Sequence, residues 1–165
     1  MSTMAERATA TQTYQVYIKA TPEAIWDALT NAERTVEYGY RGQVDYDLRP
    51  GGAYIAYATE EMLSRGAPDA VIEGEILEVD APRRLVQTWD ARFDEATGAE
   101  ASTRLSFEIE DSHPGVTKLT LTHALDGAPI LAEFVSGAMP NTGGGWPFVL
   151  SDLKTLLETR RPLGG

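Results

Sequence analysis

The hydrophobic positions of the chain change period, and each change predicts a different element. From Tyr14 to Lys19, apolar and polar residues alternate, which is typical of a half-buried strand. The segment Thr21 to Glu23 then supplies a helix cap, a proline at the first helical position and an acid in the first turn. Ile25, Trp26 and Leu29 follow at helical spacing. The sequence therefore predicts a strand followed directly by a helix.

Two further helices are predicted from caps and apolar spacing. Asn31 is a suitable cap for a short helix over 32–37, which Gly39 would end. Near the carboxyl end, 143–145 is a run of three glycines that we interpret as a hinge. It precedes a long helix over about 146–160, which Pro162 stops. The apolar stripe of this helix must cover a partner surface.

Between the helices, apolar segments are separated by turn signals at regular intervals. Because parallel strands need crossovers of about a dozen residues, this spacing favours an antiparallel meander. With 14–19, the candidates make seven strands: 43–48, 53–60, 70–79, 84–92, 102–110 and 116–123. A glycine- and proline-containing loop over 126–145 follows, in which 130–135 has the composition for a helical turn. The predicted class is α+β.

Length and composition indicate one domain over 14–165 after a flexible tail, 1–13. The chain has no cysteine, which excludes disulfides and thiolate chemistry. No apolar run approaches the roughly 20 residues of a membrane span, and the amino terminus lacks a signal-peptide core. We expect a cytoplasmic protein without a membrane span, as a monomer or homodimer.

The charge balance excludes one class of partner. Aspartate and glutamate total 25 against 14 lysine and arginine, a net charge of −11, which repels nucleic-acid backbones.

There is no glycine-rich phosphate motif and no Gly-x-Ser-x-Gly nucleophile motif. The two histidines, His113 and His123, are ten residues apart across a strand, which is a poor metal spacing. We predict no nucleic-acid partner, no metal and no cofactor.

The order of the elements and several local motifs resemble one superfamily. The motifs are Ala20-Thr21-Pro22-Glu23-Ala24-Ile25-Trp26-Asp27-Ala28-Leu29, Asp47-Leu48-Arg49-Pro50-Gly51-Gly52-Ala53-Tyr54, Glu73 to Val79 with Pro82 to Trp89, Thr117 to His123, and Gly144-Gly145-Trp146 with Leu153-Lys154. In this order they resemble the START-like helix-grip superfamily (SRPBCC), in the branch of the activator of the heat-shock chaperone ATPase. The resemblance implies a curved antiparallel sheet gripping the long carboxyl-terminal helix around an apolar cavity.

For function, the resemblance first implies a binding module for a hydrophobic or aromatic small molecule. Large amphipathic side chains are suited to line such a cavity, although ordinary core packing explains the same residues. The predicted ligand-binding residues are Trp26, Tyr38, Tyr54, Trp89, Phe107, Leu121, His123, Met139, Trp146 and Leu150. An apolar ligand would enter past the loop at 126–145.

Two alternatives from other classes remain open at this stage. An enzyme of the polyketide cyclase or dehydratase type would need an inward general acid or base, and His123 and Glu73 are the candidates. Glu73 shares its predicted face with Val71 and Leu77, whereas Glu108 should face water. The third possibility is a minimal co-chaperone that uses its outer sheet face.

Overall fold

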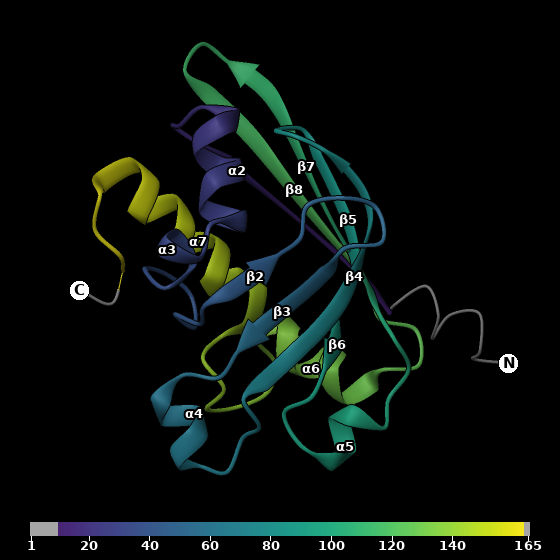
Figure 1. Cartoon of the computed structure of the whole chain (residues 1–165). Coiled ribbons are helices and arrows are strands. Elements are labelled where there is room, and N and C mark those ends of the chain that lie inside the picture. Colours follow the sequence, from purple (N-terminus) through teal and green to yellow (C-terminus); the bar gives the residue numbers. More distant parts are fainter. Residues whose placement is uncertain (1–9, 164–165) are drawn as a thin grey trace, which may run out of the picture.

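The computed structural model describes residues 10–163, in which one curved antiparallel sheet of eight strands carries all the helices (Figure 1). Along the sheet the strand order is β1-β8-β7-β5-β4-β3-β2, and β6 pairs with β4 beside this path. The strands are β1 (Thr11–Ile18), β2 (Val44–Tyr46), β3 (Ala53–Tyr57), β4 (Ala70–Asp80), β5 (Arg84–Thr88), β6 (Asp90–Ala91), β7 (Arg104–His113) and β8 (Val116–Ala124). The predicted α+β helix-grip architecture is confirmed.

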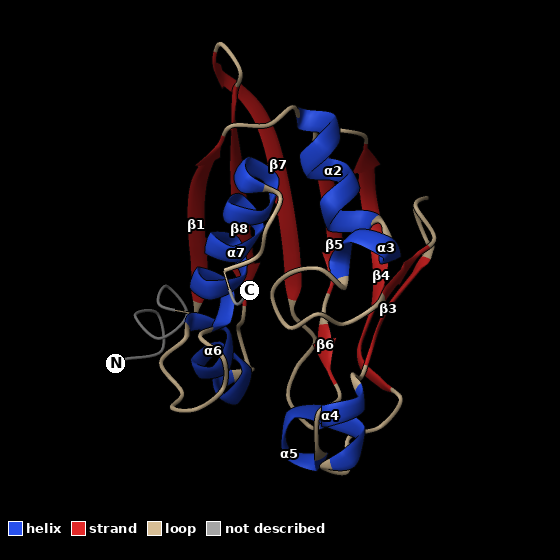
Figure 2. Cartoon of the chain, turned by 90° about the vertical axis from the view of Figure 1, so that its left-hand side faces the viewer, coloured by secondary structure: helices blue, strands red, loops and turns tan. Residues whose placement is uncertain are grey.

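The predicted helices begin where their caps indicated. The Thr21 side chain accepts from the Ala24 amide to cap α2 (Pro22–Thr30), and Asn31 caps α3 (Ala32–Thr35) through the Glu33 amide. The long helix α7 (Gly145–Thr159) lies on the same face of the sheet as α2 and α3, across β1 and β8 (Figure 2). Within 10–163, no helix is long and apolar enough to cross a bilayer.

The concave face of the sheet and these helices bury one continuous core. Alternation along β7 and β8 puts every second side chain inward, and these inward residues meet Leu150 and Leu153 of α7. The alternation of apolar and polar residues in the sequence predicts an inward set in the sheet, of which these members are buried: Ile18, Leu105, Phe107, Ile109, Leu119 and Leu121. Val16 and Leu157 are partly buried against the same core.

The predicted strand at 84–92 is divided in the structure. After β5 the chain leaves β7, and β6 pairs with Ile72 and Glu73 of β4. The Thr88 hydroxyl accepts the Glu75 amide, and Gly74 lies so close to the Thr88 carbonyl that a side chain there would collide with it. A side chain therefore replaces one rung of the backbone ladder, which the alternation of the sequence could not reveal.

Three short helices occupy places predicted as strand, turn or loop, and they gather at one end of the sheet (Figure 1). They are α4 (Glu60–Ser64), α5 (Glu95–Gly98) and α6 (Pro129–Ser136). Thr59 caps α4 and Asp94 caps α5 in a capping box, so short polar segments read as turns became single helical turns. The sheet also starts earlier than predicted, because Thr11 to Thr13 belong to β1. Residues 1–9 of the predicted tail lie outside the described residues.

Polar contacts fix α7 to its surroundings. Lys154 Nζ donates to the Tyr17 carbonyl at 2.8 Å and to Glu158 at 2.7 Å, and Glu158 accepts the Lys19 amide at 2.8 Å. Asp152 is 1% exposed, and its carboxylate accepts the amides of Gly39 at 2.8 Å and Leu163 at 2.7 Å. The helix is therefore attached to β1, to the segment after α3 and to the segment that follows the helix itself.

The three glycines before α7 are close-packed, which explains them without a hinge. Each has a positive φ, and a Cβ on Gly145 would lie 2.2 Å from the Val135 carbonyl oxygen of α6. A Cβ on Gly143 would lie 2.4 Å from the Tyr40 ring. Glycine is thus needed here for backbone conformation and for close approach of α6 to α7.

Candidate functional site

Aromatic and polar side chains from four strands or their ends and from α7 meet inside the sheet. We call Tyr46, Tyr54, Trp89, His123 and Trp146 the interior aromatic cluster. Ring centroids are 4.6 Å apart for Tyr46 and Tyr54, 5.1 Å for Trp89 and His123, and 5.6 Å for Trp89 and Trp146. Tyr54, Trp89 and His123 are buried, and Trp146 is partly exposed at the start of α7.

A chain of hydrogen bonds crosses this cluster and fixes the protonation of His123. The Trp146 indole, which can only donate, reaches His123 Nδ1 at 3.0 Å. Nδ1 is therefore the acceptor, and Nε2 carries the proton that it donates to Thr103 Oγ1 at 2.9 Å. The Thr103 hydroxyl in turn donates to the Trp89 carbonyl. Each member of the chain has a partner.

This arrangement limits what His123 can do chemically. His123 is 0% exposed, and burial lowers its pKa to about 3. To accept a proton at Nδ1, the ring would have to give up the hydrogen bond from Trp146. His123 is therefore a neutral side chain that orients Trp146, and its geometry does not favour general acid or base chemistry.

The tyrosines of the interior carry protonated hydroxyls. Burial raises the pKa of Tyr38, Tyr46 and Tyr54. The Tyr38 hydroxyl donates to the Ala28 carbonyl at 2.8 Å, and the Tyr46 hydroxyl donates to Gln87 Oε1 at 2.6 Å. The interior thus holds donors at neutral pH and no phenolate.

Most of the predicted ligand-binding residues come together, as parts of the core. Those buried in the hydrophobic core are Tyr38, Tyr54, Trp89, Phe107, Leu121 and Leu150, and His123 is a buried polar side chain in contact with Trp89. Trp26 on α2 and Trp146 on α7 are partly buried against the core. Met139 lies in the loop between α6 and α7, partly exposed, and does not join the cluster.

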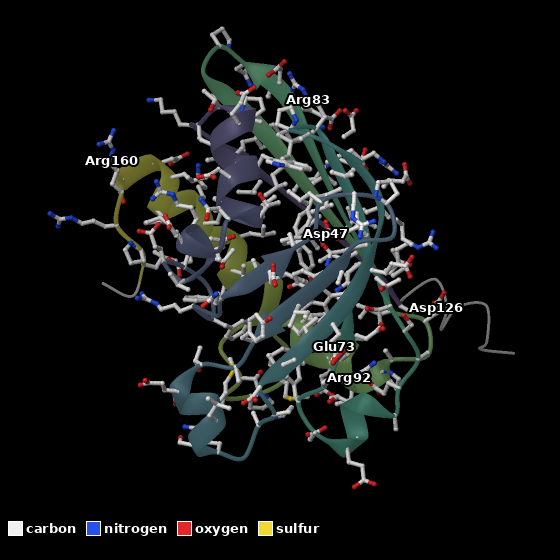
Figure 3. The ribbon with its side chains drawn as sticks, in the orientation of Figure 1. Asp47, Glu73, Arg83, Arg92, Asp126 and Arg160 are labelled. Carbon is white, nitrogen blue, oxygen red and sulfur yellow. The ribbon has the colours of Figure 1, made fainter. Side chains whose placement is uncertain are left out.

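The carboxylate candidate lies elsewhere. Glu73 on β4 is exposed, whereas its neighbour Ile72 is buried, so it does not meet the requirement for an inward acid (Figure 3). The predicted sharing of a face by Glu73, Val71 and Leu77 is not seen, because Val71 is buried while Glu73 is exposed. Register shifts of β4 fall at Val71 against β3 and at Leu77 against β5. Glu108 pairs with Arg84 at 3.4 Å at the surface, as expected. Within 10–163, no group of three acidic, histidine or cysteine side chains could hold a metal ion.

One edge of the interior is closed by an aromatic contact and a hydroxyl. Phe134 of α6 lies 5.1 Å from Phe93 and 5.8 Å from Tyr40 between ring centroids, and all three side chains are partly exposed. The Tyr40 hydroxyl donates to the Thr142 carbonyl at 2.8 Å and accepts the Gly145 amide at 2.9 Å. Tyr40 thereby fastens the loop between α6 and α7 to the segment after α3.

Two grooves flank α7 on the outside of this interior. One has a volume of about 610 Å³ and lies between β1 and α7, with Val16, Leu150 and Lys154 in its walls. The other, of about 370 Å³, lies between α7 and the first two helices, next to Ala28, Leu156 and Leu157. Neither groove includes a member of the interior aromatic cluster. Only Leu150 belongs both to a groove and to the predicted ligand-binding set.

Several polar residues of the site were not predicted. Gln87 is polar and 0% exposed. It interrupts the mostly apolar segment from Leu85 to Trp89, and this interruption could have identified it as a buried polar residue. Thr103 and Asp152 carry no comparable signal, because a threonine before a strand and an acid on a helix are ordinary at the surface. Their roles depend on partners far away in the sequence.

Comparison with known proteins agrees with this fold. The family model described as Activator of Hsp90 ATPase homolog 1-like protein matches residues 19–158. No curated protein sequence matches the chain.

Solved structures resemble the chain over nearly its whole length. CalU16 from Micromonospora echinospora has a TM-score of 0.63 at 19% identity, covering 91% of this chain and 77% of CalU16. PFC0360w, an HSP90 activator from Plasmodium falciparum, has a TM-score of 0.56 at 21% identity, covering 94% and 91%. The Aha1 dimer from Colwellia psychrerythraea has a TM-score of 0.62 at 18% identity, covering 90% and 96%. At these identities the structures show a shared fold. With the family model matching most of its length, this chain belongs to the Activator of Hsp90 ATPase homolog 1-like family.

Proposed function

We propose that this protein binds an apolar or aromatic small molecule in the cytoplasm, between the sheet and α7, against the interior aromatic cluster. The observation that carries the proposal is the composition of that cluster. Two tryptophans, two tyrosines and a neutral histidine lie together, where packing alone would be served by aliphatic side chains. A mostly apolar wall with a few fixed polar groups is typical of small-molecule sites.

The route to this site passes the loop between α6 and α7. This loop contacts the rest of the interior through Tyr40, and its neighbour Trp146 is both partly exposed and part of the cluster. Loosening the Tyr40 contacts would open a path to Trp89 and His123 without moving the sheet. We therefore place the entrance at this loop.

The proposal makes Trp146 the natural reporter of binding. Titration of aromatic and fatty-acid-like compounds should change tryptophan emission and raise the melting temperature, because the ligand binds the native state alone. Trp146→Phe should lose most of the emission change. Trp26→Phe is the matched control, since Trp26 is also partly buried but lies on α2 outside the cluster, and it should keep the signal.

A failure of the proposal would be equally clear. If no compound shifts the emission or the melting temperature of the wild type or of Trp26→Phe, the interior is a packed core and not a binding site. If Trp26→Phe loses the signal instead, the ligand lies near α2.

Activation of a heat-shock chaperone is the second candidate, favoured by the description of the matching family and of the Plasmodium falciparum relative. Its test is the ATPase rate of the chaperone with and without this protein. The oligomeric state, monomer or homodimer, also bears on it, since one structural neighbour is a dimer. Light scattering distinguishes one from two chains of 18.0 kDa.

A further inference from the structure

The buried tyrosines of the interior differ in one respect, which is the use of their hydroxyl protons. Tyr38 and Tyr46 donate to acceptors within the protein, Ala28 and Gln87. Tyr54 is 6% exposed, yet within residues 10–163 its hydroxyl donates no hydrogen bond. Its neighbour Trp89 offers only an indole donor, which can reach the Tyr54 oxygen but cannot accept its proton.

The surroundings of this hydroxyl belong to the hydrophobic core. Tyr54 packs beside Tyr46, with ring centroids 4.6 Å apart, and beside Trp89. Tyr54 points from β3 toward the same interior as Trp89, where Ala56 is the next inward residue of the strand.

The charges of the interior also restrict what can bind there. Among the described residues, the buried polar and charged side chains are Thr35, Gln87, Thr97, Thr103, Thr117, His123 and Asp152. None is a lysine or arginine, and the histidine is held neutral by its two hydrogen bonds. Asp152 is the only carboxylate of this set, and its negative charge contributes to the raised pKa of Tyr38. An anion would therefore lose its hydration without gaining a cationic partner.

We propose that the Tyr54 hydroxyl is the hydrogen-bond donor that selects the ligand, so that the site prefers neutral apolar molecules with a carbonyl-type acceptor oxygen over carboxylates. This inference rests on the proposed function and narrows its ligand class to ketones, aldehydes, esters or quinones. Burial raises the pKa of Tyr54, so the donor is present at neutral pH. A hydrocarbon of the same shape would bind without that hydrogen bond.

Three probes of one ring system test the inference: 2-ethylnaphthalene, 2-acetylnaphthalene and 2-naphthoate, each titrated by calorimetry at pH 7. The ketone should bind about three- to tenfold tighter than the hydrocarbon, the range expected for one net hydrogen bond. The carboxylate should bind most weakly. In Tyr54→Phe the ratio of ketone to hydrocarbon affinity should fall to about one, as expected when that hydrogen bond is lost.

The ratio is compared within each variant, which separates selectivity from stability. Tyr14→Phe is the matched control, because Tyr14 lies on β1 outside the interior aromatic cluster and its hydroxyl already donates to Gln12 Oε1 at 2.8 Å. It should keep the ketone preference even if its melting temperature falls. An unchanged ketone preference in Tyr54→Phe, or tighter binding of naphthoate than of the ketone, overturns the inference while the binding function stands. If the wild type binds none of the three, the proposed function fails and this inference fails with it.

Discussion

His123 illustrates how a titratable side chain can be held in one state by its neighbours. Trp146 supplies a donor on one side of the ring, and Thr103 supplies an acceptor on the other. Because an indole cannot accept, only one neutral tautomer satisfies both contacts. The histidine therefore orients a tryptophan, although its position at the end of a strand had also left a catalytic base open.

The protonation of His123 predicts a pH dependence of stability. Its folded pKa of about 3 lies below the ordinary value of 6.5, so the unfolded chain takes up the proton first. The free energy of unfolding should then fall as pH drops below about 6.5, by roughly 1.4 kcal/mol per unit, until about pH 3. Urea denaturation at pH 6.5 and pH 5 should differ by about 2 kcal/mol from this group.

Two glutamine variants check that assignment. His123→Gln should remove this loss, whereas His113→Gln should retain it, since His113 is exposed at the end of β7. A wild-type protein equally stable at both pH values would show that His123 is solvated in the native state. The pH 5 limit keeps most carboxylates ionised, so that their protonation contributes little.

At the level of single residues, sequence predicted which side chains face inward and failed on their partners. Alternation identified Leu119 and Leu121 as inward, because strand geometry is local. Asp152 was invisible, because its two amide partners come from distant segments. Glu73 was placed ambiguously for a related reason, because β4 shifts register against β3 before it and against β5 after it, and both shifts depend on the partner strands.

Among the elements, α2 and α3 were predicted from their local caps, α4 and α5 were missed although they are capped, and α6 was only partly recognised. The N-cap position of α6, Ala128, has no side-chain acceptor. Glu100, from the segment before β7, accepts the Ile130 amide at 2.7 Å and the Leu131 amide at 3.0 Å instead. A cap from thirty residues away satisfies the same amides but leaves no local motif in the sequence.

The remote cap gives a prediction for α6. Glu100→Ala should expose the first amides of the helix, so that hydrogen exchange at Ile130 and Leu131 accelerates and the protein loses about 1 kcal/mol. Glu95→Ala removes a similar exposed charge from α5 and should leave that exchange unchanged. Equal exchange in the two variants would mean that Glu100 does not cap α6 in solution.

Packing of α7 on the sheet gives a second prediction for an element. Leu153 is 0% exposed and belongs to the central core, so Leu153→Ala should cost about 2 to 5 kcal/mol of unfolding free energy. Leu63→Ala, on the exposed side of α4, should cost less than about half a kcal/mol. Chemical denaturation measures both, and similar small losses would argue against the grip of α7 by the sheet.

For the whole molecule, fold and site were unequally accessible from sequence. Strand spacing, the caps of α2 and α3 and the apolar stripe of α7 suffice for the helix-grip architecture, since each is a local pattern. The site is harder, because a cavity wall and a core have the same composition. Trp89 and Trp146 were named for that reason, but the contact that joins them through His123 required the fold.

The attachment of α7 to β1 has a consequence for how molecules meet one another. β1 is an outer strand of the sheet, and such strands offer unpaired backbone groups to other chains. Lys154 occupies the Tyr17 carbonyl and Glu158 the Lys19 amide, so side chains cover that end of the edge against intermolecular sheet extension.

Removing this cover should promote aggregation. We expect Lys154→Ala to aggregate faster than Lys118→Ala, which loses the same charge from the pair with Glu110 across β7 and β8, two strands that are paired on both sides. Light scattering, with each variant held the same number of degrees below its own melting temperature, measures the difference in aggregation rate. Identical aggregation rates of the two variants would mean that the strand edge is protected in another way. Faster aggregation of Lys154→Ala would show that Lys154 of α7 protects the open edge of the sheet from pairing with another chain.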